Sequence, residues 1–386
     1  MKNQSLIVNW NYPTRILVGA GRINELAKVC RDLGMNAPLL VTDPGLASSL
    51  MVSKVIQQAQ ASGLRTGLFC QIKTNPTGDN VMNGVYAFKA GQHDGVIAFG
   101  GGSALDAGKA IALMVGQDRP LWDFEDVGDN WTRVNVSAMA PVLAIPTTAG
   151  TGSEVGRASV ITDAEKQVKK IIFHPKMLPA MVILDPELTV GLPKSLTAAT
   201  GMDALSHCLE AYCSNYYHPM AEGIALEGIR LIKGNLIQAY KDGSDLEART
   251  HMLVASAMGA TAFQRGLGAM HALAHPLGAI YDVHHGRLNA VLMPYVLLAN
   301  RSEIENKIER LANYLSIANG FDGFLDWIEQ MRLELGIENT LSQLGIDHSQ
   351  IDRLAKMATE DAAAASNPVL FTLEQYKELL SKAIGE

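Results

Sequence analysis

Four of the chain's ten histidines lie in one short segment, MHALAHPLGAIYDVHHG. His271 and His275 are four residues apart, so on a helix both imidazoles face the same side. His284 and His285 follow as neighbours. The zinc-protease pattern H-E-x-x-H does not apply, because Ala272 follows the first histidine and no glutamate stands ready as a general base.

A second segment, TGMDALSHCLEAY, places Asp203 four residues before His207. On a helix this puts a carboxylate and an imidazole on one face, a donor pair that suits Fe²⁺ or Zn²⁺. Alone the pair is weak evidence, since an aspartate and a core histidine would look the same. Together with the histidine-rich segment, it predicts a divalent metal site. The chain's remaining histidines are isolated and are interpreted as surface or satisfied core residues.

The first half of the chain contains a segment that could bind phosphate. DGVIAFGGGSALDAGKAIAL reads as a strand, a glycine turn and a helix that opens at Ser103. Gly101 and Gly102 allow close approach of a pyrophosphate, and the helix N-terminus supplies free N–H groups. The segment matches neither GxGxxG nor a Walker loop, so a tight turn is the alternative. ILVGAGRI, with Gly19 and Gly21, lacks a third glycine and is interpreted as a turn.

Two more segments could contact a nucleotide. AIPTTAGTGSE follows a predicted strand, where hydroxyl groups can hold ribose and phosphate oxygens, although a plain Ser/Thr turn is the alternative. Its hydroxyl residues are Thr147, Thr148, Thr151 and Ser153. LLVTDPG ends a predicted strand on Asp43, which could accept hydrogen bonds from a ribose diol and repel a 2′-phosphate. This favours NAD over NADP, but Asp-Pro-Gly is also an ordinary turn.

The elements that must position these residues fall into two groups. Between about residue 13 and 187, six apolar runs alternate with helical patterns: RILVG, APLLVTD, RTGLFC, DGVIAFG, PVLAIPTT and AMVILDP. Several are apolar without alternation, as in strands buried on both faces of a parallel sheet. GRINELAKVCRDLG and SALDAGKAIALMVG are predicted helices between them, which gives βαβ units. After LDPELTVGLPKS the strand pattern fades, so we predict an α/β domain over 1–187 and an all-helical domain over 188–386.

Composition narrows the function classes. The 386 residues are 48% hydrophobic and 18% charged, enough for two ordinary domains with large cores. No apolar run approaches the roughly 20 residues that span a bilayer, so no membrane partner is expected. The net charge of −7, with both signs scattered, argues against nucleic acid as a partner. The N-terminus lacks a signal-peptide pattern and the four cysteines show no CxxC, so a cytoplasmic protein is expected.

The chain resembles the iron-dependent (group III) alcohol dehydrogenases over nearly its whole length. GGGSALDAGK, TTAGTGSE, LTAATGMDALSHCLEAY and GAMHALAHPLGAIYDVHHG occur in the family's order and spacing. The resemblance implies a dehydroquinate synthase-like fold. An α/β dinucleotide-binding domain with a mostly parallel sheet would precede an all-α metal-binding domain, with the active site in the cleft between them. It also implies hydride transfer between nicotinamide and a small alcohol or aldehyde held on a metal, by a homodimer or higher homo-oligomer.

The resemblance also implies roles for individual residues. Its metal ligands correspond to Asp203, His207, His271 and His285. Where the family has Pro-His-Gly this chain has His284-His285-Gly286, so His284 is an alternative ligand, although spacing and the glycine favour His285. His275 is then no ligand; it lines the site and carries protons. The family commonly uses Fe²⁺, and Zn²⁺ fits the same ligands.

For the cofactor, the resemblance implies a set of residues in the first domain. They are Asp43, Asn75, Gly101, Gly102, Ser103, Thr147, Thr148, Thr151, Ser153 and Lys169. Lys170 is adjacent to Lys169 and is an alternative to it. Asp106 could cap or orient the phosphate-binding helix.

Two other function classes remain as alternatives. A lyase in the manner of dehydroquinate synthase would need a basic cluster for an anionic substrate, yet the histidine-rich segment has no Lys or Arg and is only flanked by Arg265 and Arg287. A binding or regulatory protein with a vestigial site conflicts with the presence of all four ligands. Val369 stands where the family often has arginine, so the substrate is narrowed no further than a small, mostly uncharged alcohol or aldehyde.

Overall fold

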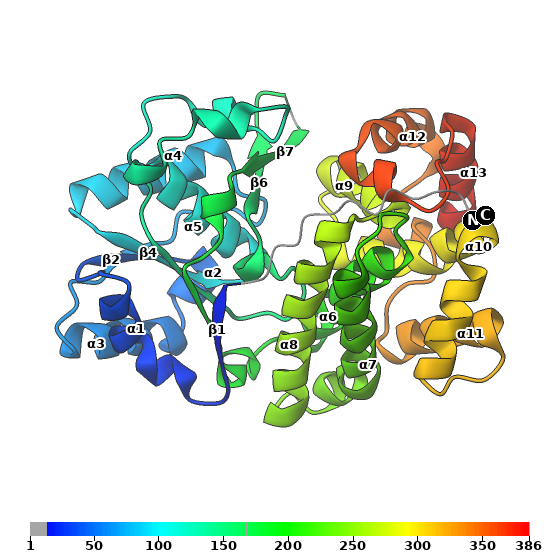
Figure 1. The fold of residues 1–386 in the computed structure, drawn as a ribbon, viewed down its shortest axis with the longest axis horizontal. Helices are drawn as coiled ribbons and strands as arrows, with labels where there is room; N and C mark the ends of the chain where they lie inside the picture. The colour runs from blue at the N-terminus through cyan, green and yellow to red at the C-terminus, as the bar shows by residue number, and fades with distance from the viewer. Residues whose placement is uncertain (1–13, 167, 386) are drawn as a thin grey trace. The chain divides into compact units, whose positions relative to one another are not determined.

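The structure, a computed structural model, describes residues 14–166 and 168–385. The chain divides into two compact units, of which the first ends at Gly191 and the second begins at Leu192. Each unit is described separately, and both are drawn in Figure 1. Within the described residues, no helix is both long and apolar enough to cross a membrane.

The first unit is built on a six-stranded parallel sheet with the strand order β1-β8-β5-β4-β2-β3. Its strands are β1 (Arg15–Val18), β2 (Pro38–Val41), β3 (Gly67–Phe69), β4 (Gly95–Gly100), β5 (Val142–Pro146) and β8 (Met181–Leu184). Strands β2, β4, β5 and β8 are buried at every position, which explains why their sequences are apolar without alternation. The structure thus confirms the predicted parallel α/β fold.

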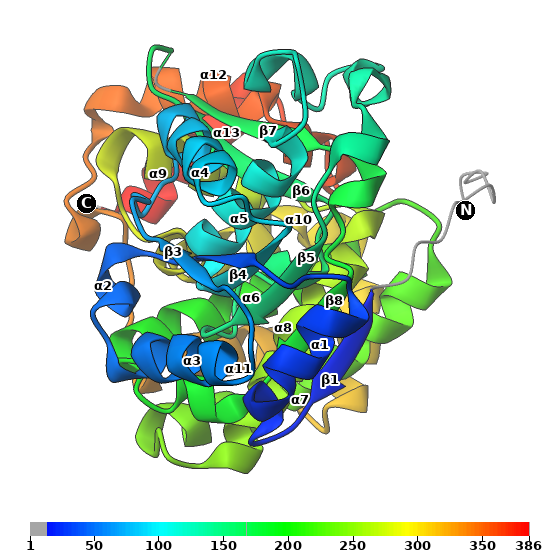
Figure 2. The same cartoon turned by 90° about the vertical axis from the view of Figure 1, so that its left-hand side faces the viewer.

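Helices cover both faces of this sheet. α1 (Leu26–Asp32) and α3 (Leu50–Ala61) lie on one face, and α4 (Gly78–Ala90) and α5 (Gly102–Met114) lie on the other (Figures 1 and 2). The short helix α2 (Pro44–Ala47) follows β2 directly. Short 3₁₀ turns join the remaining segments, at Arg22–Glu25, Leu121–Phe124, Asn130–Arg133, Val136–Ala138, Ser153–Val155, Pro175–Met177 and Pro186–Thr189.

A two-stranded antiparallel hairpin outside the main sheet was not predicted. It consists of β6 (Ala158–Asp163) and β7 (Val168–Phe173), paired in a register that sets Val160 opposite Ile171. One apolar side chain from each strand, Ile161 and Ile172, is fully buried. The hairpin packs against α5, so it belongs to the framework that holds the glycine turn.

The strand order places the predicted nucleotide segments at one point of the sheet. The chain runs outward from β2 to β3 and then returns to β4, from which it continues in the opposite direction to β5. The ends of β2 and β4 are neighbours, because Val41 pairs with Ala98. Ligands of open α/β sheets bind outside the carboxyl ends of strands at such a switch point. Asp43 and the glycine turn follow those two strand ends.

Over its described residues 192–385 the second unit contains helices and no strand, as predicted. Its helices are α6 (Lys194–Cys213), α7 (Pro219–Lys241), α8 (Leu246–Ala262), α9 (Ala269–Tyr281), α10 (His285–Tyr314), α11 (Gly320–Glu334), α12 (Ile351–Glu360) and α13 (Leu373–Ile384). Short 3₁₀ turns lie at Phe263–Arg265, Ser342–Leu344, His348–Gln350 and Ala362–Ser366. α6 packs against α7, α8 and α10, and α9 packs against α10 and α12. α6 is therefore buried along most of its length, and both predicted metal segments lie on central helices.

Candidate metal and cofactor sites

Four potential metal-binding side chains converge in the helical unit. Asp203 and His207 lie on α6, His271 lies on α9, and His285 is the first residue of α10. One donor atom from each lies within 4.8 Å of all the others. Asp203, His207 and His271 are buried, and His285 is partly exposed. One carboxylate and three imidazoles can hold Fe²⁺ or Zn²⁺, and the partly exposed side leaves access for a further ligand.

Asn289, one helical turn after His285 on α10, marks the point where the donor atoms converge. Its side-chain nitrogen lies 2.9 Å from Asp203 Oδ1 and 3.2 Å from Nε2 of both His271 and His285. An amide NH₂ group has two hydrogens and cannot satisfy three acceptors at once. His207 Nδ1 is buried and has no hydrogen-bond partner within the described chain. This excess of acceptor atoms fits a bound cation.

The electrostatics of the cluster suit metal binding. Burial raises the pKa of Asp203, but the neighbouring His207, His285 and His271 and the hydrogen bond from Asn289 outweigh this and hold it at about 2. Burial lowers the pKa of His271 well below its usual value, and the charges of His207 and His275 act in the same direction. The aspartate is therefore ionised and His271 is neutral, which are the forms that bind metal.

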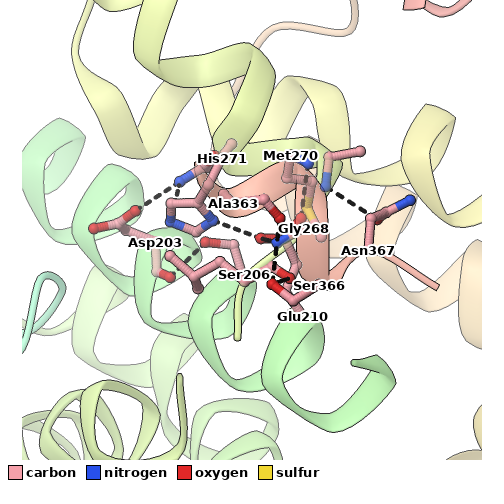
Figure 3. Close-up of polar contacts among 12 residues, drawn as sticks. Asp203, Ser206, Glu210, Gly268, Met270, His271, Ala363, Ser366 and Asn367 are labelled. Carbon is pink, nitrogen blue, oxygen red and sulfur yellow. Dashed lines mark hydrogen bonds and ion pairs between the residues drawn. The ribbon is translucent and has the colours of Figure 1, made fainter. Parts of the chain in front are cut away.

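Glu210 and Asp203 lie on opposite sides of the His271 ring (Figure 3). Its carboxylate accepts hydrogen bonds from the backbone N–H groups of Gly268 and Met270, at 2.8 and 2.7 Å, and contacts His271 Nδ1 at 2.7 Å. Burial raises the pKa of Glu210 to about 7, although the hydrogen bonds from Met270 and Gly268 oppose the shift. Glu210 was not predicted, yet it continues the face of α6 that carries Asp203 and His207.

His275 lies beside the cluster but is not one of its four members. Its Nδ1 is 2.8 Å from Asp361 Oδ2, and its ring stacks on that of His285 with centroids 5.5 Å apart. The side chains of His275 and Asp361 are 30% and 19% exposed, so both are accessible to solvent or substrate. Asp361 was not predicted, because it is 86 residues away in the sequence.

His284 has a different place from its neighbour. It caps the N-terminus of α10, where its Nδ1 accepts a hydrogen bond from the Gly286 N–H at 3.2 Å, and its side chain is exposed. Gly286 is required for α10 to approach α6, because a Cβ atom there would lie 2.1 Å from the Ala199 carbonyl oxygen. His284 thus caps α10, and His285 is the one of the two that belongs to the donor cluster.

In the first unit, the glycine turn and the TTAGTGSE loop pack against each other. A Cβ atom on Gly102 would lie 2.7 Å from the Thr151 side chain, and one on Gly101 would lie 3.6 Å from Thr148. Gly101, the residue before α5, has no side chain to cap this helix, so it leaves the first N–H groups of α5 without a side-chain cap. Such a helix start binds phosphate. Thr147 joins the same region, since its N–H donates to the Gly100 carbonyl at 3.0 Å.

Three of the other predicted cofactor residues hold this region together. Asp106 accepts hydrogen bonds from the Ser153 hydroxyl at 2.5 Å and the Val160 N–H at 3.0 Å, and it pairs with the buried Lys109 at 3.2 Å. The Ser103 hydroxyl donates to the Thr74 carbonyl, next to Asn75 in the sequence. Asp106 therefore ties α5 to the TTAGTGSE loop and to β6.

Asp43 and the two adjacent lysines occupy distinct positions. Asp43 Oδ1 accepts from the Leu46 N–H at 3.0 Å and caps α2, while its Oδ2 lies beside Gly100. Lys170 pairs with Glu125 at 2.9 Å and with Asp163 at 3.4 Å. Lys170 is therefore engaged within the first unit, and the choice of Lys169 as the lysine that contacts the cofactor stays a prediction.

Comparisons with known proteins place each of the two units in one family. Residues 13–186 match the model for iron-containing alcohol dehydrogenase, and residues 197–384 match the C-terminal model of the same family. The chain is 36% identical over 383 residues to 4-hydroxybutyrate dehydrogenase of Cupriavidus necator, covering 97% of this chain and 99% of that protein.

Solved structures of similar proteins share the fold of this chain. A 1,3-propanediol oxidoreductase superposes with a TM-score of 0.93 at 34% identity, covering 98% of this chain and 100% of that one. Sulfoacetaldehyde reductase from Bifidobacterium kashiwanohense, solved with NAD⁺, superposes with a TM-score of 0.90 at 27% identity, covering 98% of this chain and 99% of that one. With a donor cluster of this composition and family models over both units, the chain belongs to the iron-containing alcohol dehydrogenases.

Proposed function

We propose that this protein oxidises small uncharged alcohols with NAD⁺ and reduces the corresponding aldehydes, with Fe²⁺ held by Asp203, His207, His271 and His285. The observation that carries the proposal is the convergence of these four donor atoms within 4.8 Å of one another. Zn²⁺ suits the same donors, so metal analysis of the purified protein decides between the two.

Different residues of the chain have different roles in the proposed reaction. A metal held by these residues would lower the pKa of the alcohol hydroxyl, and a bound nicotinamide would supply the hydride acceptor. Asp203 supplies the single negative charge among the four donors, so the donor set cancels one of the two positive charges of a divalent cation. The remaining charge is available to the substrate oxygen. The partly exposed side of the cluster, at His285, is where a substrate can enter.

His275 is placed to accept the alcohol proton. Its ring stacks on His285, and its Nδ1 contacts Asp361, so its Nε2 is left for proton exchange. A carboxylate that accepts from Nδ1–H stabilises the imidazolium that forms when Nε2 takes a proton. Asp361 therefore both orients His275 and favours its function as a base.

The first unit is proposed to hold the cofactor. The start of α5, with Gly101, Gly102 and Ser103, would bind the pyrophosphate, and Thr148 and Thr151 pack beside it. The Bifidobacterium kashiwanohense protein, which shares this fold, was solved with NAD⁺. Further contacts are assigned to Asp43, Asn75, Asp106, Thr147, Ser153 and Lys169.

The substrate is proposed to carry no charge. Arg265 donates to the carbonyls of Tyr216 and Tyr212 and pairs with Glu222 at 2.9 Å. Arg287 is held by Glu338, through Nε at 3.3 Å. The two cations that flank the histidine-rich segment are therefore both occupied, which also disfavours a lyase for an anionic substrate.

A substrate panel tests the proposal. The protein, loaded anaerobically with Fe²⁺, is assayed for NADH formation with ethanol, 1-butanol, 1,3-propanediol and 4-hydroxybutyrate. We expect kcat/KM to be highest for an uncharged alcohol. A clear preference for 4-hydroxybutyrate, the substrate named for the Cupriavidus necator relative, would overturn the uncharged class, and no NADH with any alcohol would overturn the whole proposal.

Replacing Asp43 with asparagine should narrow the preference for NADH over NADPH. A 2′-phosphate beside this carboxylate should cost about 1–3 kcal/mol, or about 10–150-fold in preference. Asparagine caps a helix as well as aspartate does, so α2 should persist. Binding of both cofactors is measured by nucleotide fluorescence. Asp32→Asn, which removes the same charge from the exposed last residue of α1, is the control. Equal binding of both cofactors by the unaltered protein would refute the argument.

Replacing Gly102 with alanine should weaken NADH binding. The added Cβ would press on the Thr151 side chain at 2.7 Å and push apart the turn and the loop. We expect about a 10-fold rise in Kd, since a rearrangement costing about 1–3 kcal/mol is typical of an overpacked contact. Gly191→Ala is the matched control, because nothing lies within 4 Å of a Cβ atom there. An unchanged Kd for NADH in Gly102→Ala would show that the glycine turn is not part of the cofactor site.

We further propose a homo-oligomer in a reducing, cytoplasmic compartment. Among the described residues β1 lies at one edge of the six-stranded sheet, and Leu370 and Tyr216 expose 72% and 53% of their surface, as expected where copies associate. All four cysteines are free, and three are buried. Light scattering behind a sizing column tests the assembly, and a monomer at micromolar concentration would contradict it.

A further inference from the structure

Besides its hydrogen bonds to the backbone at the start of α9, the Glu210 carboxylate contacts the His271 imidazole at 2.7 Å. We infer that Glu210 is a positioning residue that fixes which nitrogen of His271 faces the metal cluster. The inference rests on the proposed role of His271 as a ligand. The side chain of Glu210 is only 4% exposed, and none of its atoms belongs to the four-donor cluster, so it acts through His271.

The hydrogen bonds define the tautomer of His271. Oε2 of Glu210 accepts from the Gly268 N–H and lies 2.7 Å from His271 Nδ1, while Oε1 accepts from the Met270 N–H. An ionised carboxylate can only accept, and both oxygens of Glu210 already accept backbone hydrogen bonds, so with Glu210 ionised the proton of His271 lies on Nδ1. Nε2 then carries the lone pair, and this is the nitrogen near Asn289 and the other donors. Outer partners of this kind set ring orientation and raise ligand basicity.

A role in helix capping alone does not account for these contacts. Glu210 and Asn367 share the start of α9: Glu210 accepts from Gly268 and Met270, and Asn367 accepts from Ala269 at 3.0 Å. Both side chains satisfy backbone groups that a helix leaves unpaired at its N-terminus. Only Glu210 also contacts a histidine. The two residues therefore form a matched pair for experiment, one with the imidazole contact and one without it.

Three variants separate the two roles. Glu210→Ala removes the imidazole contact together with two backbone contacts. Glu210→Gln can keep an oxygen toward Gly268 and His271 and loses only the acceptor for Met270. Asn367→Ala loses a backbone contact at the same helix start without touching a histidine. Thermal unfolding of the metal-free proteins reports the capping role, which all three variants should weaken.

Two readouts report the positioning role. The tautomer of His271 is read from ¹⁵N shifts of the metal-free protein, with His271→Ala used to assign its signals, and Co²⁺ affinity is measured by competition with a chelator. We expect the Nδ1–H tautomer in the unaltered protein. Glu210→Ala should lose that preference and bind Co²⁺ about 10–100-fold more weakly. Glu210→Gln and Asn367→Ala should stay within a few-fold of the unaltered protein.

The outcomes distinguish this inference from the proposed function. An Nε2–H tautomer in the unaltered protein overturns the inference without any variant, so it remains testable if Glu210→Ala fails to fold. Equal loss of Co²⁺ affinity in Glu210→Ala and Asn367→Ala also overturns it, because helix docking would then be the cause. If His271→Ala still binds Co²⁺ tightly, His271 is no ligand and the proposed metal site itself is wrong.

Discussion

Alanine in place of Asp203, His207, His271 or His285 should leave the protein with little bound metal and little dehydrogenase activity. Each change removes one of four donors, and the three that remain leave the cation with an incomplete shell. The loss should exceed the roughly 10–100-fold that follows removal of a mere outer partner. Asp203→Ala should be the most severe, because it also removes the only negative charge of the cluster and the acceptor of the Asn289 side chain.

Metal content by mass spectrometry, measured beside the alcohol oxidation rate, checks this expectation. His284→Ala is the matched control, since it removes an exposed imidazole next to His285 and should keep the metal. It should cost only the cap of α10, about 0.5–2 kcal/mol of stability. A His284→Ala protein without metal, together with a loaded His285→Ala protein, would show that the adjacent histidines exchange roles.

The fold could be read largely from local pattern. Strands buried on both faces must be apolar throughout, which made β2, β4, β5 and β8 visible in the sequence. The outer strands β1 and β3 are less buried, and their runs were recognised because they alternate with helical patterns. The β6–β7 hairpin was not predicted, because its two strands are only partly buried, lie outside the main sheet and contain charged residues such as Lys169 and Lys170. The charge of Lys170 pairs with Glu125, which lies in a distant segment that no local pattern reveals.

The candidate metal cluster was visible for a different reason. Side chains four apart on a helix share a face, so Asp203 and His207 could be paired from the sequence. The same rule pairs His271 with His275, but in the structure only His271 belongs to the donor cluster, and the ring of His275 lies beside it. The residues behind the histidines are set by tertiary packing. Glu210 is 61 positions from His271, and spacing within one helix cannot give such a pair.

His275→Ala should slow alcohol oxidation while leaving the metal in place. The imidazole contacts Asp361 and stacks on His285, but it contributes no atom to the cluster of four donors. A positioned general base typically contributes about 10²–10⁴-fold to rate, and less where water can take the proton. NADH binding should stay near normal, because the cofactor contacts are assigned to the other unit.

Added imidazole makes this test specific to proton transfer. If His275 accepts the alcohol proton, free imidazole should restore part of the rate of His275→Ala and should do nothing for His285→Ala, which lacks the metal. Asp361→Asn should show a smaller loss, because the ring keeps its place but loses the carboxylate that stabilises its charged form. If imidazole does not change the rate of His275→Ala, and the order of preferred alcohols is altered, then His275 only shapes the pocket wall. Metal lost in proportion to activity would instead make His275 a ligand, so metal content measured beside the imidazole series separates all three roles.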